Sequence, residues 1–170
     1  MKLDIVTYPD PVLRDSAADI PEITPEIKRL AQDMVQSMYE GNGIGLAAPQ
    51  VGESLRLITV DISGPDKRED LLILLNPKIL SKDGKVESEE GCLSFPELRA
   101  VVERAENVVV EALDLDGHTV ALDADGLLAI CLQHEIDHLN GKLIIDHVSR
   151  LKRSLYEKKA KKWKKQTARS

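Results

Sequence analysis

The stretch ICLQHEIDHLNG, residues 130–141, decides how this chain folds, because it continues a helical pattern of apolar residues through two histidines. Apolar side chains recur with the period of an α-helix at Leu127, Leu128, Ile130, Cys131 and Leu132. Gly141 suits the C-terminal end of a helix, where glycine is favoured. We therefore predict a buried helix that starts near Asp125 and ends near Gly141.

The same stretch contains the pattern His-Glu-x-x-His. On a helix, His134 and His138 lie one turn apart on one face, so both imidazoles can reach one metal ion at roughly 2 Å. Glu135 lies roughly 100° further round the helix, where a general base that acts on water belongs. The alternative is a pair of ordinary histidines on a half-buried helix face, and the short motif alone leaves both interpretations open.

A catalytic metal site needs a third protein ligand and one open position. Proteases that extend the motif to a third histidine would place it at position 144, which is Ile144 here, so that class is excluded. Glu157 is a possible ligand, but it lies in a lysine-rich tail. Cys131 and His138 are separated by a helical rise of about 10 Å, too far for both to join His134 on one ion. We expect Cys131 to be an apolar wall residue beside the site.

Three further candidates lie outside the helix. His118 falls in a predicted hairpin turn and His147 beyond the helix end, and we interpret both as surface or packing histidines. Cys92 lies in EEGCLSFPE, residues 89–97, where Gly91 permits a close approach of the backbone. Spacing alone leaves Cys92 either a buried free thiol or the missing ligand.

The rest of the chain predicts two more helices and antiparallel strands. Thr24 and Pro25 are typical of the N-terminus of a helix that ends near Gly41. Strands are expected at 55–63 and 71–80, with a loop at 64–70 between them. Hairpin turns are expected at Asp83–Gly84 and Asp116–Gly117. We predict an α+β fold in which antiparallel β-sheets pack around a central metal-binding helix, with an N-terminal and a C-terminal helix.

Length and charge suggest one domain with a distinctive tail. A chain of 170 residues fits a single domain, so we assign residues 1–148 to one catalytic domain and 149–170 to a basic C-terminal helix of the same domain. Residues 150–170 hold ten Lys and Arg against Glu157 alone, a net charge of +9, whereas the whole chain carries −6. The remainder therefore carries −15. Leu151, Leu155 and Trp163 form one narrow apolar stripe on that helix.

The N-terminus and the cysteine content indicate the compartment. The start, MKLDIVTYPD, has no apolar run long enough for a signal peptide, and no segment approaches a membrane span. We expect a cytoplasmic protein without membrane association. In a reducing compartment, two cysteines are expected to be buried, catalytic or metal-bound rather than paired.

Three separated segments resemble the signature motifs of bacterial peptide deformylases: GIGLAAPQ (43–50), EGCLS (90–94) and QHEIDH (133–138). Their order and separations match, and the resemblance extends over most of the chain. It implies that Cys92, His134 and His138 bind a divalent ion, with Glu135 as the base. Ferrous iron is the expected physiological ion, and zinc, nickel or cobalt can occupy the same site.

The resemblance also implies the substrate, an N-formylmethionyl peptide whose formyl group is hydrolysed to formate during protein biosynthesis. The Gln50 side-chain amide and the Leu93 backbone N–H would stabilise the oxyanion. The methionine side chain would enter a pocket formed by Ile44, Glu90, Ile130 and Cys131. The glycines of GIGLAAPQ do not suit a phosphate loop, because no Lys-Ser/Thr follows; Ile44 and Gly45 are instead expected to make strand-like contacts with the peptide.

The basic tail has two interpretations, either a solvated helix or a contact with ribosomal RNA through phosphate neutralisation. We expect a monomer. Two rival functions are a general metallopeptidase, which would cleave unblocked peptides, and a catalytically silent metal- or RNA-binding protein, which would show no turnover when loaded with metal.

Overall fold

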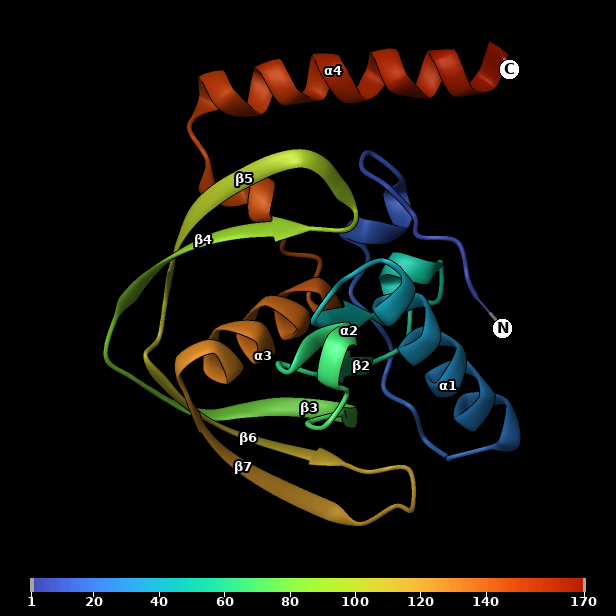
Figure 1. Cartoon of the computed structure of the whole chain (residues 1–170), viewed down its shortest axis with the longest axis vertical. Coiled ribbons are helices and arrows are strands. Elements are labelled where there is room, and N and C mark those ends of the chain that lie inside the picture. The colour runs from blue at the N-terminus through green and yellow to red at the C-terminus, as the bar shows by residue number, and fades with distance from the viewer. Residues whose placement is uncertain (1, 170) are drawn as a thin grey trace.

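A computed structural model describes residues 2–169, with side chains through residue 165. Helix α3 (Gly126–Leu139) lies between two antiparallel β-sheets, seen above and below it in Figure 1. Helix α1 (Pro25–Glu40) packs beside one end of the larger sheet, and α4 (Arg150–Arg169) runs along the outside of the smaller one. The predicted α+β fold with a central helix is confirmed.

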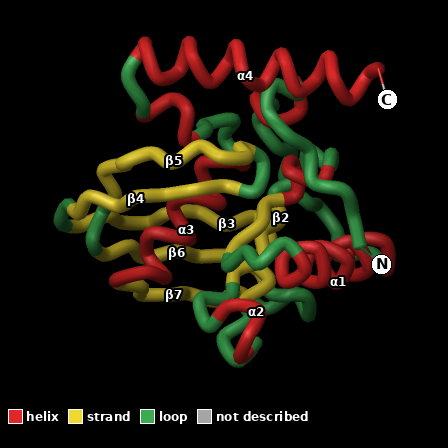
Figure 2. The backbone as a smooth tube through the Cα atoms, turned by 45° about the horizontal axis from the view of Figure 1, so that its top comes forward, coloured by secondary structure: helices red, strands yellow, loops and turns green. Residues whose placement is uncertain are grey.

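The larger sheet has five strands and the smaller one has two (Figure 2). In spatial order, the larger sheet contains β1 (Gly45–Ala47), β2 (Leu57–Val60), β3 (Leu72–Asp83), β6 (Asn107–Leu113) and β7 (Thr119–Asp125). The smaller sheet pairs β4 (Val86–Cys92) with β5 (Phe95–Arg104). The chain crosses from one sheet to the other after β3 and returns after β5, so the two sheets enclose α3.

Helix α3 carries many apolar side chains because both sheets cover it. The side chains of Ala129, Leu132 and Ile136 are buried in one core with strand residues such as Ile58 and Val110. The helix ends where the chain turns sharply at Gly141, which has a φ of +71°. A Cβ atom there would lie 2.5 Å from the carbonyl oxygen of Arg14, so both the backbone conformation and the space favour glycine.

The N-terminal helix starts as predicted. The Thr24 hydroxyl accepts a hydrogen bond from the Ile27 backbone N–H at 3.2 Å, and Pro25 occupies the first helical position. Gly41 follows the last helical residue. The buried side of α1, including Met34 and Met38, packs in a core with residues of β1 and β2, and so supports the edge strand β1 from behind.

The strand and turn predictions need three corrections. The hairpin turn at Asp116–Gly117 is confirmed, because β6 and β7 flank it and pair with each other. A turn also joins β3 to β4 at Asp83–Gly84, but the predicted hairpin there is wrong, because the two strands belong to different sheets. The segment 64–70 is not only a loop: Gly64–Lys67 form a single helical turn, α2, which is too short for a periodic apolar pattern to reveal. The expected strand 55–63 is reduced to β2, Leu57–Val60, because Asp61 already turns away to accept hydrogen bonds from Ser63.

Helix α4 is docked by a different face from the one predicted. Leu151 and Leu155 are 71% and 57% exposed, whereas Tyr156 and Ala160 are 6% and 2% exposed. The Tyr156 ring packs against Phe95, with ring centroids 5.9 Å apart, and Trp163 borders the same core. The predicted stripe was therefore wrong for both leucines, because the aromatic ring of Tyr156 fills the space above β5. The side chains of residues 166–170 lie outside the described residues.

Among the described residues, no helix is both long and apolar enough to cross a membrane.

Candidate active site

A pocket of about 690 Å³ opens between α3, the β1 region and the β4–β5 sheet. Most of the residues predicted for the site line it: Ile44, Gly45, Gln50, Glu90, Cys92, Leu93, Ile130, Cys131, His134 and Glu135. They come from three sequence segments that the fold brings to one place. The remaining predicted residue, His138, is 1% exposed and is not among the residues that line the pocket.

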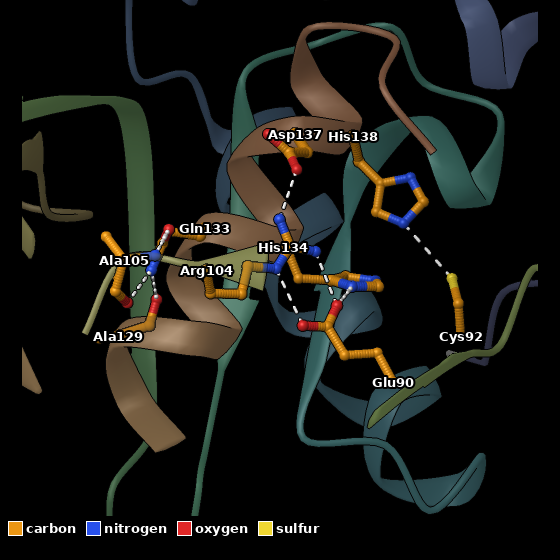
Figure 3. Close-up of polar contacts among 9 residues, drawn as sticks. All are labelled: Glu90, Cys92, Arg104, Ala105, Ala129, Gln133, His134, Asp137 and His138. Atoms are coloured by element: carbon orange, nitrogen blue, oxygen red, sulfur yellow. Dashed lines mark hydrogen bonds and ion pairs between the residues drawn. The ribbon is translucent and has the colours of Figure 1, made fainter. Parts of the chain in front are cut away.

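The three predicted metal ligands meet at the inner end of this pocket. The ligand atoms of Cys92, His134 and His138 all lie within 4.8 Å of one another. Cys92 comes from the end of β4 and the histidines from α3, and the Cys92 Sγ lies 3.3 Å from His138 Nε2 (Figure 3). One thiol and two imidazoles are a ligand set that suits divalent transition metals, so the residues present fit such an ion.

The orientation of His134 is fixed by a carboxylate. Its Nδ1 donates a hydrogen bond of 2.9 Å to Glu90 Oε1, so Nε2 is the nitrogen left for a ligand. Burial would raise the pKa of Glu90, but hydrogen bonds from Arg104 and His134 lower it to about 2. Glu90 is therefore an acceptor at neutral pH, and this fixes which nitrogen of His134 carries the proton.

The two histidines experience opposite electrostatic surroundings. Burial lowers the pKa of His138 well below its ordinary value, and the neighbouring charges on His134 and Arg104 lower it further. Burial also opposes the charged form of His134, but Glu135 and the other acidic neighbours outweigh burial and raise the pKa of that imidazole. His138 is thus held neutral, the form in which an imidazole binds a metal.

Glu135 is buried beside the ligands without a full set of partners. It is 4% exposed, and its Oε1 atom has no hydrogen-bond partner among the described residues. Burial raises the pKa of this carboxyl group to about 7, against 4.5 for an ordinary glutamate. A carboxyl group poised near neutral pH, with a free oxygen in a pocket, is suited to take up and release a proton.

Gly45 makes room for this carboxylate. A Cβ atom at Gly45 would lie 2.4 Å from Glu135 Oε2 and 2.8 Å from Cys131 Sγ. Strand β1 can therefore approach α3 this closely only with glycine at position 45. From the sequence we expected Gly45 to contact the substrate peptide, and the structure gives it a further role that the sequence did not indicate, which is to leave room for Glu135 and Cys131.

Gln50 presents its amide nitrogen to the site. Its Oε1 accepts a hydrogen bond of 2.9 Å from the Ala47 backbone N–H, so the Nε2 group must point the other way. Nε2 lies 3.3 Å from Cys92 Sγ and donates to Ser94 Oγ at 3.1 Å. Leu93 lies between Cys92 and Ser94 and also lines the pocket.

The other ligand candidates lie elsewhere. Cys131 forms part of the pocket wall, and its thiol donates to the Ile44 carbonyl oxygen at 3.6 Å. Glu157 on α4 accepts hydrogen bonds from Tyr8 and Arg153. His118 is exposed in the β6–β7 turn beside Asp114, and His147 is exposed in the turn after α3. None of these four residues belongs to the group of Cys92, His134 and His138.

Several residues of the site were not predicted as site residues. Leu98 and Leu127 also line the pocket, but Leu98 fits an ordinary strand pattern and Leu127 was used only as part of the apolar period that predicted the helix. Arg104 is 5% exposed and binds Glu90, yet it stands in the sequence as one charged residue among many. A buried arginine is found only once the acidic partners are located in space.

Comparison with known proteins gives one consistent result. The family model described as polypeptide deformylase matches residues 2–154. The peptide deformylases of Hydrogenovibrio crunogenus and Desulfosudis oleivorans are 51% and 50% identical over 161 residues, covering 95% and 94% of this chain and 94% and 93% of theirs. The crystal structure of a peptide deformylase from Legionella pneumophila is 45% identical, covers 100% of this chain and 99% of its own, and superposes with a TM-score of 0.91.

Proposed function

The chain belongs to the polypeptide deformylase family, and we propose that Cys92, His134 and His138 hold its metal ion while Glu135 transfers the protons of the reaction. Enzymes of this family are metal-dependent hydrolases that remove the N-formyl group from the initiator methionine of nascent polypeptides and release formate. One observation carries the assignment of residues: a thiol and two imidazoles converge beside a buried carboxylate with a free oxygen.

The bound ion would supply Lewis acidity that makes water a better nucleophile and polarises the formyl oxygen. Glu135 accepts the proton that water loses as its oxygen adds to the formyl carbon. The raised pKa of Glu135, about 7 in the protein without an ion, favours both uptake and release of this proton near neutral pH. When the carbon–nitrogen bond breaks, Glu135 returns the proton to the departing amine, so the products are formate and a free methionyl N-terminus.

The negative oxygen that develops on the formyl carbon needs hydrogen-bond donors. We assign the Gln50 Nε2 group and the Leu93 backbone N–H to this role, because Gln50 Nε2 is turned toward Cys92 by the bond between its Oε1 and Ala47. A fixed donor of this kind contributes roughly 2.7 to 4 kcal/mol to transition-state stabilisation. The bond to Ala47 matters because it fixes the donor before substrate arrives.

The methionine side chain is proposed to enter the apolar part of the pocket. Ile44, Ile130 and Cys131 line it, and Leu98 and Leu127 extend the apolar surface. Glu90 also lines the pocket, but its carboxylate is engaged by Arg104 and His134, so only its methylene groups are available to methionine. Gly45 lies on the edge strand β1, from which a peptide can be bound by strand-like hydrogen bonds.

We propose Fe²⁺ as the physiological ion, with Zn²⁺, Ni²⁺ or Co²⁺ as substitutes. The proposal rests on the resemblance to bacterial peptide deformylases and on the Cys92 ligand. A thiolate bound to ferrous iron predicts loss of activity in air, which the nickel-loaded protein should not show. Equal loss in both forms would contradict the assignment of iron.

We also propose a cytoplasmic monomer whose basic helix α4 contacts the ribosome. Tyr156 and Ala160 of α4 share a core with Phe95, which supports treating the tail as part of the one domain. The opposite side of α4 presents exposed lysines together with Leu151 and Leu155. Such a surface suits ribosomal RNA, whose phosphates attract lysines.

The deciding experiment measures formate release from a formyl-methionyl peptide by protein purified without oxygen and loaded with iron. An unblocked peptide of the same sequence is the control. Turnover of the formyl peptide alone supports the proposal. Cleavage of the unblocked peptide would indicate a general metallopeptidase, and no turnover of either would indicate a silent binding protein.

A further inference from the structure

Arg104 is buried between the two structural layers that supply the metal ligands. It ends strand β5, and its side chain is 5% exposed. On one side its Nε and Nη2 atoms bind both carboxylate oxygens of Glu90, at 2.9 and 2.6 Å. On the other side its Nη1 atom binds Asp137 Oδ2 at 2.6 Å (Figure 3). Three of its nitrogens are thus used, and the two carboxylates belong to different layers.

The two carboxylates lie next to the ligands in the sequence. Glu90 precedes Cys92 by two residues on β4, and Asp137 lies on α3 between His134 and His138. Arg104 therefore connects the strand that carries the thiol to the helix that carries the imidazoles. Glu90 extends this connection directly to a ligand, because it also accepts the hydrogen bond from His134 Nδ1.

A second set of hydrogen bonds also joins α3 to the end of β5. Gln133 accepts a hydrogen bond from the Ala105 backbone N–H through Oε1 and donates to the Ala105 carbonyl oxygen through Nε2, both at 2.9 Å. Ala105 follows Arg104, so Gln133 and Asp137, one helical turn apart, both bind the end of β5. This pair lies roughly 100° round the helix from the histidine pair, so it fixes the rotation of α3 about its axis.

Stability alone does not account for this arrangement. Burial of the Arg104 guanidinium with the buried Glu90 and the half-buried Asp137 carboxylates is costly, and apolar side chains of similar volume often stabilise a protein as well or better. Any cation could neutralise the two carboxylates. Contact with both of them at once requires a planar guanidinium with several fixed donors. A lysine at this position would keep the charge but could not make the two-pronged contact with Glu90 and also reach Asp137.

We propose that Arg104 is a positioning residue that sets the geometry of the metal site by joining β4 to α3, and that Gln133 and Asp137 fix α3 for the same purpose. This inference rests on the proposed metal site. Arg104 acts through Glu90 and Asp137 and does not itself reach the ion. Its removal changes how tightly and in what geometry the ion is held, before any effect on the reaction.

The test compares Co²⁺ binding by the full-length wild type and the Arg104→Gln variant. Loss of interactions that orient metal ligands typically weakens metal affinity by roughly 10- to 100-fold, and we expect a Co²⁺ dissociation constant raised within that range. At saturating Co²⁺, the visible absorption bands should also shift, because they depend on coordination geometry. Arg104→Lys should restore less than half of the lost affinity.

The matched control is Glu103→Gln, which alters the neighbouring residue of β5. Glu103 forms an exposed ion pair at 3.8 Å with Lys85, the residue before β4, so its loss should change Co²⁺ affinity less than about twofold. Asp137→Asn provides a milder second variant, because it removes one carboxylate charge and keeps the shape. If Arg104→Gln does not fold, weaker affinity and shifted bands in Asp137→Asn support the proposal.

The outcome that overturns the proposal is wild-type Co²⁺ affinity and spectrum in Asp137→Asn and in a folded Arg104→Gln protein. Cys92→Ala separates this result from a failure of the metal site itself. If Cys92→Ala loses Co²⁺ while Arg104→Gln keeps it unchanged, only the positioning role is wrong. If Cys92→Ala also binds Co²⁺ like the wild type, the proposed ligand set is wrong and the inference falls with it.

Discussion

Helices α3 and α4 show how the same local structure serves two different purposes. Helix α3 is enclosed by both sheets, and its polar residues are buried with defined partners or beside the pocket. Helix α4 touches the protein through one face, mainly Tyr156 and Ala160, and leaves most of its charged residues in solvent. A charge on α3 is thus costly and requires a partner or a chemical role, whereas a charge on α4 needs neither.

The largest difference is expected in the turnover number, between substitution of Glu135 on α3 and of Glu157 on α4. Glu135→Ala removes the proposed base on α3, and we expect the turnover number for formate release to fall by roughly 10²- to 10⁴-fold while the metal content stays at the wild-type value. Glu157→Ala on α4 is the matched control and should change turnover less than about twofold. Near-normal turnover of Glu135→Ala with metal bound would remove the base assignment.

A second difference concerns acid stability. The pKa of Glu90 is lowered from 4.5 to about 2 in the folded protein, so its charge stabilises the fold above pH 4.5. This stabilisation, about 3 kcal/mol, is lost as the pH falls from 4.5 toward 2. Urea unfolding of the metal-free protein should therefore show a shallower loss of stability across this window in Glu90→Gln than in the wild type. Parallel pH curves would contradict the role of the buried pair.

A third difference lies within α4 itself. Tyr156→Ala should lower the free energy of unfolding by about 2 to 3 kcal/mol, because it empties space beside Phe95 and removes the hydrogen bond from the Tyr156 hydroxyl to the Pro96 carbonyl oxygen. Leu155→Ala, one residue away and exposed, should change it by less than about 0.5 kcal/mol. Thermal or urea unfolding of both variants measures this contrast, and equal losses would mean that α4 docks by another face.

The smallest expected effect concerns the outer face of α4. Four exposed lysines are replaced by glutamine together: Lys158, Lys161, Lys162 and Lys165. Ribosome binding should weaken by about fivefold and depend less on salt, because fewer counterions are released, while deformylation of a short peptide is unchanged. The control replaces four exposed lysines elsewhere: Lys28, Lys67, Lys82 and Lys85. Equal binding by all three proteins would exclude the α4 contact.

Local patterns in the sequence predicted local structure well. The period of apolar residues located α3, and the spacing of His134 and His138 placed both on one face, because helix geometry fixes the positions of residues four apart. The N-terminus of α1 followed from Thr24 and Pro25. In each case the relevant neighbours are within one turn in the sequence.

Contacts between distant segments could not be predicted in the same way. Spacing left Cys92 undecided, and only the resemblance to a known family selected it as the third ligand. Arg104 and Asp137 gave no signal, because a buried ion pair looks like a surface one until the burial is known. The exposed stripe of Leu151 and Leu155 was wrong for a related reason: a period shows which residues share a face but not which face is covered.

The ligands of the site come from opposite layers, β4 on one side and α3 on the other. The metal supply therefore affects the free energy that holds these two layers together in the folded protein. An ion that binds only the closed form adds stability in proportion to the logarithm of its free concentration. Each tenfold rise above the dissociation constant contributes about 1.4 kcal/mol. In a cell short of the metal, newly made copies would be more readily opened and degraded, so the amount of intact enzyme would follow the metal supply.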